Sequence, residues 1–144
     1  EMKDIVHFTS SKLDNSRPVH LLGIGDPRDI WDFVADGIDT FDCVSPTRIA
    51  RHGSALVKGK QGKINLKNVK YKNNLNPIDN ECNCYTCKNF TLAYLHHLFS
   101  AQELLGLQLV TNHNIYFMNN LMKEVRSSID NNDFDNAKKK WLNS

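Results

Sequence analysis

The sequence has 144 residues, of which 40% are hydrophobic and 24% charged, and its formal net charge is +2 at pH 7. This length and composition allow one domain with a modest core, and they exclude a disordered or collagen-like chain. Charged or polar residues interrupt every apolar stretch before the roughly 18–20 residues that a membrane-spanning helix needs. We therefore expect a soluble protein with no membrane partner.

The chain opens with residues that have the composition of a helix already under way. Residues 3–13 carry this pattern, and position 1 is Glu instead of Met. We therefore expect the sequence to be a fragment of a longer protein, with a vector remnant at the first position as the alternative.

A strand, a helix and a second strand are predicted next. The short apolar run Val19–Gly23 indicates a buried strand. Asp26 is the expected N-cap of the helix, Pro27 suits its first position, and Gly37 suits its end. Ile38–Val44 predicts the second strand. Connections this short are typical of a βαβ unit, so the two strands should be parallel.

Positive charge is concentrated in one window of the chain. No acidic residue lies between Asp42 and Asp79. The basic residues of this window are Arg48, Arg51, Lys58, Lys60, Lys63, Lys67, Lys70 and Lys72. Such a window indicates a polyanion partner, with a solvated lysine-rich hairpin as the alternative. The hairpin itself is predicted over residues 54–72, exposed, with apolar runs at Ala55–Val57 and Ile64–Leu66.

The remainder of the chain has helical periodicity. A Pro- and Asn-rich connection at 73–80 leads into a cysteine cluster, and a helix is predicted from Thr91 with Gly106 near its end. Thr111 is expected to cap the next helix. A terminal helix is predicted over Phe134–Leu142.

Three cysteines within six residues are the strongest chemical signal. Cys82, Cys84 and Cys87 lie too close together to staple a secreted fold, which favours a reducing cytosol. A zinc ion takes four such ligands tetrahedrally, so a closed structural site is expected, with a redox Cys-x-x-Cys pair as the alternative. His113 is a candidate fourth ligand at the predicted start of the later helix. The other histidines that follow the cluster are His96 and His97.

Two further features adjoin the ends of the predicted strands. Gly23 and Gly25 join a strand end to a helix start, where backbone amides favour phosphate or a ring edge; turn formation is the alternative. Asp42 lies at the carboxyl end of the second strand, where α/β barrels carry their active sites. It is therefore a catalytic candidate, with a carboxylate that holds the following loop as the alternative. Its neighbour Cys43 is expected in the core.

Several segments together closely resemble the bacterial tRNA-guanine transglycosylases (queuine tRNA-ribosyltransferases). They are Leu21–Gly25, Gly37–Arg48, the Cys82-x-Cys84-x-x-Cys87 cluster and His113–Ile115. The resemblance runs in order from about residue 1 to residue 130. Agreement of several motifs in both sequence and spacing makes it specific.

The resemblance implies an α/β fold that is the C-terminal part of a (β/α)8 TIM barrel, with strands seven and eight, flanking helices and a zinc-binding subdomain. The implied parts are residues 1–17 as the end of barrel helix six, 18–53 as the last βα units with the active-site loop, 54–73 as a basic hairpin, 74–130 as the zinc-binding helical subdomain, and 131–144 as a C-terminal helix or tail. Two strands cannot close such a barrel, so other residues are expected to cover the sheet edges.

The family exchanges the wobble guanine of certain tRNAs for a 7-deazaguanine precursor of queuosine. The resemblance implies that Asp42 attacks the ribose anomeric carbon and forms a covalent enzyme–RNA intermediate, and that Leu22 and Gly23 line the base pocket. The target nucleotide must leave the base stack to be reached. The implied RNA-binding residues are Gly23, Ile24, Gly25, Asp26, Pro27, Arg28 and Asp29, followed by Thr47, Arg48, Ile49, Ala50 and Arg51 in a loop that recognises the anticodon.

The same resemblance implies the cofactor and the partners. One structural Zn²⁺ would be held by Cys82, Cys84, Cys87 and His113. The partners would be a tRNA with a GUN anticodon, a 7-deazaguanine base and a second copy bound through the zinc subdomain, in the cytoplasm. We also expect the lysine hairpin to contact the RNA.

One expectation separates this chain from its parent protein. The family's general acid/base aspartate lies upstream of the residues present, so the chain alone is expected to be inactive. A free-standing, zinc-stabilised RNA-binding module without catalysis is the alternative.

Overall fold

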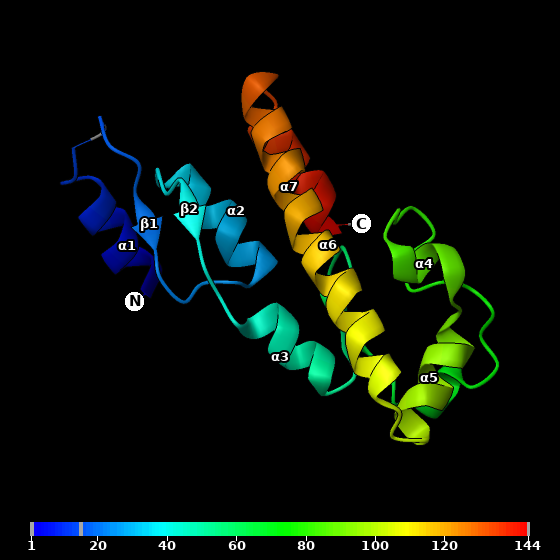
Figure 1. The fold of residues 1–144 in the computed structure, drawn as a ribbon. Helices are drawn as coiled ribbons and strands as arrows, with labels where there is room; N and C mark the ends of the chain where they lie inside the picture. Colours follow the sequence, from blue (N-terminus) through cyan, green and yellow to red (C-terminus); the bar gives the residue numbers. More distant parts are fainter. Residues whose placement is uncertain (1, 15, 144) are drawn as a thin grey trace. The chain divides into compact units, whose positions relative to one another are not determined.

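The computed structural model describes residues 2–14 and 16–143. The chain forms two compact units, residues 1–45 and residues 46–144 (Figure 1). Each unit has buried apolar residues of its own, and together they mix helices with short strands. None of the helices in the described ranges is both long and apolar enough to cross a bilayer.

The first unit contains α1 (Met2–Ser10), β1 (His20–Leu21), α2 (Pro27–Ala35) and β2 (Thr40–Phe41). The strands are parallel, with His20 opposite Thr40, which confirms the predicted strand–helix–strand order. They are shorter than predicted, and β1 is not the buried strand expected, because His20 is exposed and Leu21 only half-buried. The helix begins as predicted, because the Asp26 side chain accepts a hydrogen bond from the Arg28 amide at 2.9 Å. It ends before Gly37, whose φ of +86° favours glycine.

The helix α1 confirms the predicted N-terminal helix and lies against α2. Polar contacts join the two helices: Lys3 pairs with Asp32, and His7 Nδ1 lies 2.7 Å from an Asp36 oxygen. None of the residues of α1 is buried. The core of this unit therefore comes from α2 and its surroundings, through Ile30, Trp31, Phe33 and Ile38.

The segment after β2 corrects one prediction. Residues 47–51, expected as a loop, belong to α3 (Ser45–Arg51). Proline at the second position of this helix is tolerated because the first amides of a helix have no intrahelical partner. The Ser-Pro pair thus starts a helix here instead of only ending a strand.

The predicted hairpin is present, but one of its faces is buried. Strands β3 (Ser54–Leu56) and β4 (Lys63–Asn65) pair antiparallel, with Ala55 opposite Ile64. Ala55, Leu56 and Ile64 are buried, because side chains alternate along a strand and the apolar ones face the core. A short 3-10 helix, η1 (Val69–Tyr71), follows.

The helical region is divided differently from the prediction. After α4 (Tyr85–Asn89), α5 (Leu92–Ser100) ends early, and α6 runs over Leu104–Asp130. Gln102 has a φ of +58°, which breaks the helix, so Gly106 lies in the first turn of α6 instead of ending the previous helix. Thr111 is therefore an interior residue of α6 and not its cap. The terminal helix α7 (Phe134–Asn143) confirms the prediction.

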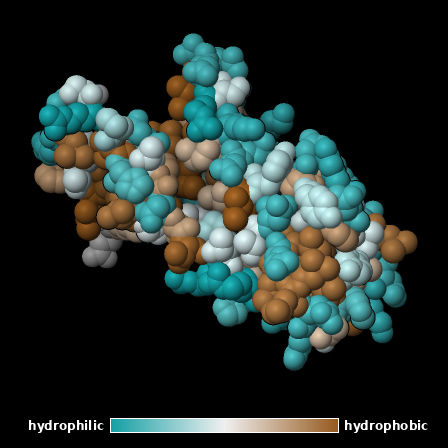
Figure 2. Space-filling model, viewed as in Figure 1, coloured by the Kyte–Doolittle hydropathy of each residue, from teal (hydrophilic) through white to brown (hydrophobic). Residues whose placement is uncertain are grey.

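Helix α6 is the centre of the second unit. It contacts β3, α4, α5 and α7. The core cluster of this unit consists of Ala50, Ala55, Ile64, Leu66, Tyr71, Ile78, Cys84, Cys87, Leu92, Leu95, Leu98, Phe99, Leu109 and Val110. Apolar side chains are also exposed on the visible face of the unit (Figure 2). Cys84 and Cys87 are members of this core cluster.

Candidate metal centre and strand-end carboxylate

The three clustered cysteines and His113 come together beside α6. Cys84 is the N-cap of α4, Cys87 lies within α4, and Cys82 lies in the turn before it. His113 comes from the middle of α6 and not from a helix start. One ligand atom from each of the four residues lies within 4.8 Å of the other three.

The distances within this cluster suit a tetrahedral metal ion. His113 Nδ1 lies 3.8, 3.5 and 3.4 Å from the sulfur atoms of Cys82, Cys84 and Cys87. Zinc bonds of about 2.3 Å to sulfur and 2.0 Å to nitrogen would place those atoms about 3.5 Å apart in a tetrahedron. The donor set and the distances from Nδ1 to the sulfur atoms therefore fit an ion of this kind.

Local hydrogen bonds explain why this short segment turns its thiols inward. The Asp79 carboxylate accepts from the Glu81 amide at 2.8 Å, and the Asp79 carbonyl accepts from the Cys82 amide at 3.3 Å. The Cys87 amide then donates to the Cys84 sulfur at 3.3 Å, which caps α4. Two consecutive turns therefore bring the three sulfur atoms to one side.

A contact outside the cluster determines how the imidazole is oriented. His113 Nε2 lies 2.9 Å from the carbonyl oxygen of Leu56. A carbonyl only accepts, so Nε2 carries a proton, and Nδ1 is the nitrogen that would present its lone pair to a metal. His113 is fully buried, which leaves the ring no solvent-facing alternative.

The electrostatics of the four groups show how strongly they interact. The hydrogen bond with Cys87 is the main cause that lowers the pKa of Cys84, and the same contact raises the pKa of Cys87. Burial lowers the pKa of His113, but hydrogen bonds to Cys82 and Cys84 outweigh it and raise this pKa to about 9. A bound metal ion would replace the protons of these hydrogen bonds, because its ligands are deprotonated sulfur atoms and a neutral imidazole.

The two other histidines considered from the sequence lie elsewhere. His96 Nδ1 contacts the Leu66 carbonyl oxygen at 2.8 Å, and His97 is exposed on α5. Among the described residues, the one cluster of potential metal ligands therefore contains His113 and neither of these two.

Sequence reasoning gave no role to Asn114, although it stands next to His113. Its side chain is fully buried, accepts from the Leu56 amide at 2.9 Å, and donates to the carbonyls of Pro46 and Ser54 at 2.9 and 3.1 Å. The signal available was its place in the His113–Ile115 motif. The partners lie roughly 60 residues away, so no local pattern could reveal them.

Asp42 lies directly after β2, within the first unit. Its side chain is 62% exposed, and Oδ1 accepts from the Gly23 amide at 3.2 Å. His20 Nε2 lies 3.4 Å from the same oxygen. The structure thus brings Asp42 together with Gly23, while the neighbouring Leu22 is exposed on the loop that follows β1.

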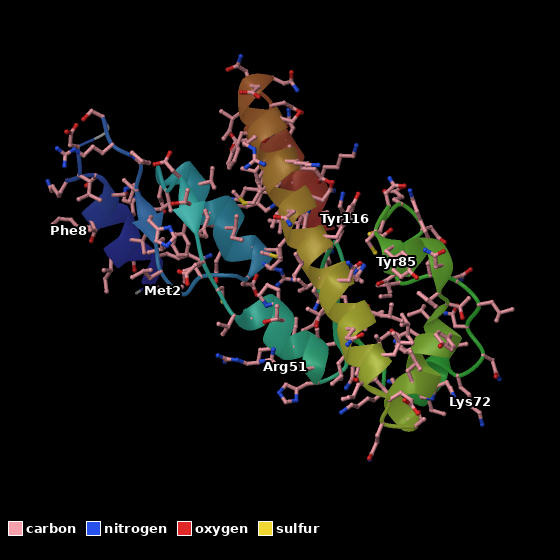
Figure 3. All side chains as sticks on the ribbon, viewed as in Figure 1. Met2, Phe8, Arg51, Lys72, Tyr85 and Tyr116 are labelled. Carbon is pink, nitrogen blue, oxygen red and sulfur yellow. The ribbon has the colours of Figure 1, made fainter. Side chains whose placement is uncertain are left out.

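The other residues singled out for RNA binding are distributed over both units. The side chains of Pro27 and Ala50 are buried and belong to the cores of their units. Arg48 and Arg51 are exposed on α3, and Figure 3 shows the Arg51 side chain extending away from the ribbon. Cys43, expected in the core, is half-buried, and its sulfur accepts from the Ser45 amide.

Fold and site together define a mixed helix–strand protein with a Cys₃His centre suited to a metal ion and an exposed carboxylate at a strand end. The sequence profile described as TGT, queuine tRNA-ribosyltransferase, matches residues 1–144. The chain therefore belongs to the queuine tRNA-ribosyltransferase family.

Individual relatives agree with this assignment. A queuine tRNA-ribosyltransferase from Roseiflexus sp. (strain RS-1) is 46% identical over 144 residues, which are 99% of this chain and 36% of that protein. The protein of the same name from Dehalococcoides mccartyi is 44% identical over 99% of this chain and 37% of its own length. The protein of the same name from Streptococcus pneumoniae (strain Hungary19A-6) is 47% identical over 90% of this chain and 33% of its own length. The chain spans about a third of the length of these relatives.

Proposed function

We propose that the chain is part of a tRNA-guanine transglycosylase, which exchanges the wobble guanine of tRNA for a 7-deazaguanine base, with Asp42 as the nucleophile. The observation that carries this proposal is the exposed carboxylate at the end of β2, held at one oxygen by the Gly23 amide at 3.2 Å. This place in a parallel α/β fold is where barrel enzymes carry their reacting groups. The parent protein would complete the barrel, of which β1 and β2 would be strands seven and eight.

The chemistry follows from a carboxylate beside a sugar. An oxygen of Asp42 attacks the anomeric carbon of the ribose, the glycosidic bond to guanine breaks, and a ribosyl ester forms. The incoming base then displaces the carboxylate, so two inversions retain the configuration. A residue of the parent outside this chain would donate the proton to the departing guanine and remove it from the incoming base. Residues 1–144 alone would therefore be inactive.

The substrate contacts are proposed for residues that precede and follow Asp42 in the sequence. Leu22 and Gly23 would line the base pocket, and residues 23–29 would border the RNA. Arg48 and Arg51 on α3 would attract the phosphates of the anticodon loop. A tRNA with a GUN anticodon in the cytoplasm is the proposed substrate, and a second copy of the protein is the proposed partner of the region around the Cys₃His centre.

The basic window supports an RNA partner, with one exception. Lys58 Nζ lies 2.7 Å from a Glu124 oxygen, so its charge is neutralised within the protein. Lys70 lies over the ring of Tyr71, at 5.0 Å from its centre, and remains exposed. The other basic side chains of the window are exposed, at Arg48, Arg51, Lys60, Lys63, Lys67 and Lys72.

We propose zinc as the ion of the Cys₃His centre. Bound there, it would supply structural cross-linking and no catalysis, because three sulfur atoms and one imidazole fill a tetrahedral shell and leave no open position. The ion would hold α4 against α6 and, through His113, against β3.

Exchange of labelled guanine into tRNA by the full-length parent protein tests the activity. Asp42→Asn preserves the shape of the side chain but removes the nucleophile, so both exchange and the covalent RNA adduct should be lost. Asp130→Asn, at the exposed end of α6, is the matched control and should retain both. An adduct that persists in Asp42→Asn would refute the assignment. Tight tRNA binding without exchange by the unaltered parent would favour an RNA-binding module instead.

A further inference from the structure

Three side chains share one face of the two-stranded sheet in the first unit. His20 lies opposite Thr40 in the strand register, and Asp42 follows two residues later. Because side chains alternate along a strand, Thr40 and Asp42 point to the same side. His20 Nδ1 lies 2.8 Å from Thr40 Oγ1, and its Nε2 lies 3.4 Å from Asp42 Oδ1.

The partners of this imidazole determine where its proton lies. An ionised carboxylate only accepts, so the nitrogen that faces Asp42, Nε2, carries a hydrogen. In the neutral ring Nδ1 is then an acceptor, and the Thr40 hydroxyl donates to it. Thr40 therefore orients the His20 ring so that Nε2 faces Oδ1 of Asp42 at 3.4 Å, an electrostatic contact longer than an ordinary hydrogen bond.

The two oxygens of Asp42 are not equivalent. The Gly23 amide and the His20 imidazole both approach Oδ1. Oδ2 has no hydrogen-bond partner among residues 2–14 and 16–143, and the side chain is 62% exposed. One oxygen is thus held by the protein, and the other is open to a ligand.

We propose that His20 is a positioning residue for Asp42. Its imidazole, oriented by Thr40, holds Oδ1 together with the Gly23 amide, so that Oδ2 is the atom that bonds to the ribose anomeric carbon. The inference rests on the proposed function, since it assigns a role within the same site. Contacts of this kind are often long without substrate and shorten in the complex.

The exposure of His20 makes this role separable from folding. Its side chain is 43% exposed, so replacing it removes little buried surface. The chain also offers a matched control, because His7 forms another exposed His–Asp pair, with Asp36 at 2.7 Å, on a different part of the same unit. His7→Phe removes a comparable pair away from Asp42.

The test compares His20→Phe, His20→Gln, Thr40→Val and His7→Phe in the full-length parent. Steady-state guanine exchange yields kcat and the KM for tRNA, and single-turnover trapping yields the rate of adduct formation. In His20→Phe we expect kcat and the adduct rate to fall between about 10-fold and 100-fold, with KM little changed, because misplaced reacting groups cost rate more than binding. The amide of His20→Gln places an N–H near the former Nε2 and should restore most of the rate. Thr40→Val should show a smaller loss, and His7→Phe none.

An unchanged kcat in His20→Phe would overturn the inference, and so would equal losses in His20→Phe and His20→Gln, which would indicate a merely structural effect. If His20→Phe fails to fold, His20→Gln and Thr40→Val decide the question: a normal adduct rate in Thr40→Val would overturn the orienting role. The Asp42→Asn variant separates this inference from the proposed function. An adduct in Asp42→Asn refutes the function, whereas a lost adduct in Asp42→Asn with full activity in His20→Phe refutes only the role of His20.

Discussion

The His113 imidazole donates from Nε2 to the Leu56 carbonyl at 2.9 Å, while its Nδ1 faces the three sulfur atoms of the cysteine cluster. The next residue of α6, Asn114, accepts from the amide of the same Leu56 at 2.9 Å. Two consecutive residues of one helix therefore satisfy both backbone groups of one strand residue. Residues 113 and 114 of α6 therefore connect the candidate metal centre to strand β3 of the hairpin.

Metal removal should act mainly on the region around the cluster. A structural zinc ion contributes on the order of 10 kcal/mol to the free energy of folding. Chelation in the parent protein should therefore speed amide hydrogen exchange in residues 74–130 and change it less in residues 18–46. Hydrogen–deuterium exchange measured by mass spectrometry, together with the metal content, checks this. Cys84→Ser should lose the metal, whereas Cys43→Ser, whose thiol lies outside the cluster, should retain it. Unchanged exchange in residues 74–130 after chelation would show that the site is not structural.

Replacement of Asn114 should destabilise the second unit strongly. Asn114→Ala removes three hydrogen bonds of a fully buried side chain, and each buried group left without a partner costs about 1–3 kcal/mol. Asn112→Ala, at an exposed position of the same helix, should change the free energy of unfolding by no more than about 0.5 kcal/mol. Thermal unfolding of both variants provides the comparison. Equal melting temperatures would contradict the role given to Asn114.

Gly106 allows α6 to approach α5 closely, and this packing should outweigh helix propensity. A Cβ at this position would lie 3.1 Å from the Cβ of Leu98, which is buried in α5. Propensity alone would make Gly106→Ala stabilising by about 1 kcal/mol, but Leu98, which is packed in the core, would have to give way to the added methyl group. We therefore expect a net loss of stability in denaturant unfolding. Gln108→Ala, exposed on the same helix, is the control, and a stabilised Gly106→Ala would disprove the packing argument.

Trp141 should account for most of the attachment of α7. It is the one buried residue of this helix. Its ring packs edge-on against that of Phe117 in α6, with 5.7 Å between the ring centres. Trp141→Ala should lower the free energy of unfolding by about 3–5 kcal/mol. Trp141→Phe keeps an aromatic contact and should lower it less. Lys139→Ala, exposed on α7, should have no effect on the melting temperature. Limited proteolysis should cleave α7 faster in Trp141→Ala only.

Local features of the fold were predictable because their causes are local. The start of α2 at Asp26 and Pro27, its end before Gly37 and the parallel strands around it follow from caps, turns and short connections. The failures share a cause as well. The boundary between α5 and α6 depends on the positive φ of Gln102, and a glutamine in the sequence does not predict such a backbone conformation. One face of the hairpin is buried because β3 packs against α6, whereas Lys63 alternates with the buried Ile64 and is exposed.

The sequence by itself determined that the three cysteines lie close together, because residues two and three positions apart cannot be far from one another. It also determined the family, through motifs that agree in order and spacing. The resemblance also implied His113 as the fourth ligand, but only the tertiary structure revealed that the carbonyl of Leu56, from a strand far back along the chain, contacts the other nitrogen of that ring. It likewise revealed that His20 and Gly23 contact the same oxygen of Asp42. Such contacts depend on how separate elements pack, and packing is a property of the whole unit and not of any local run of residues.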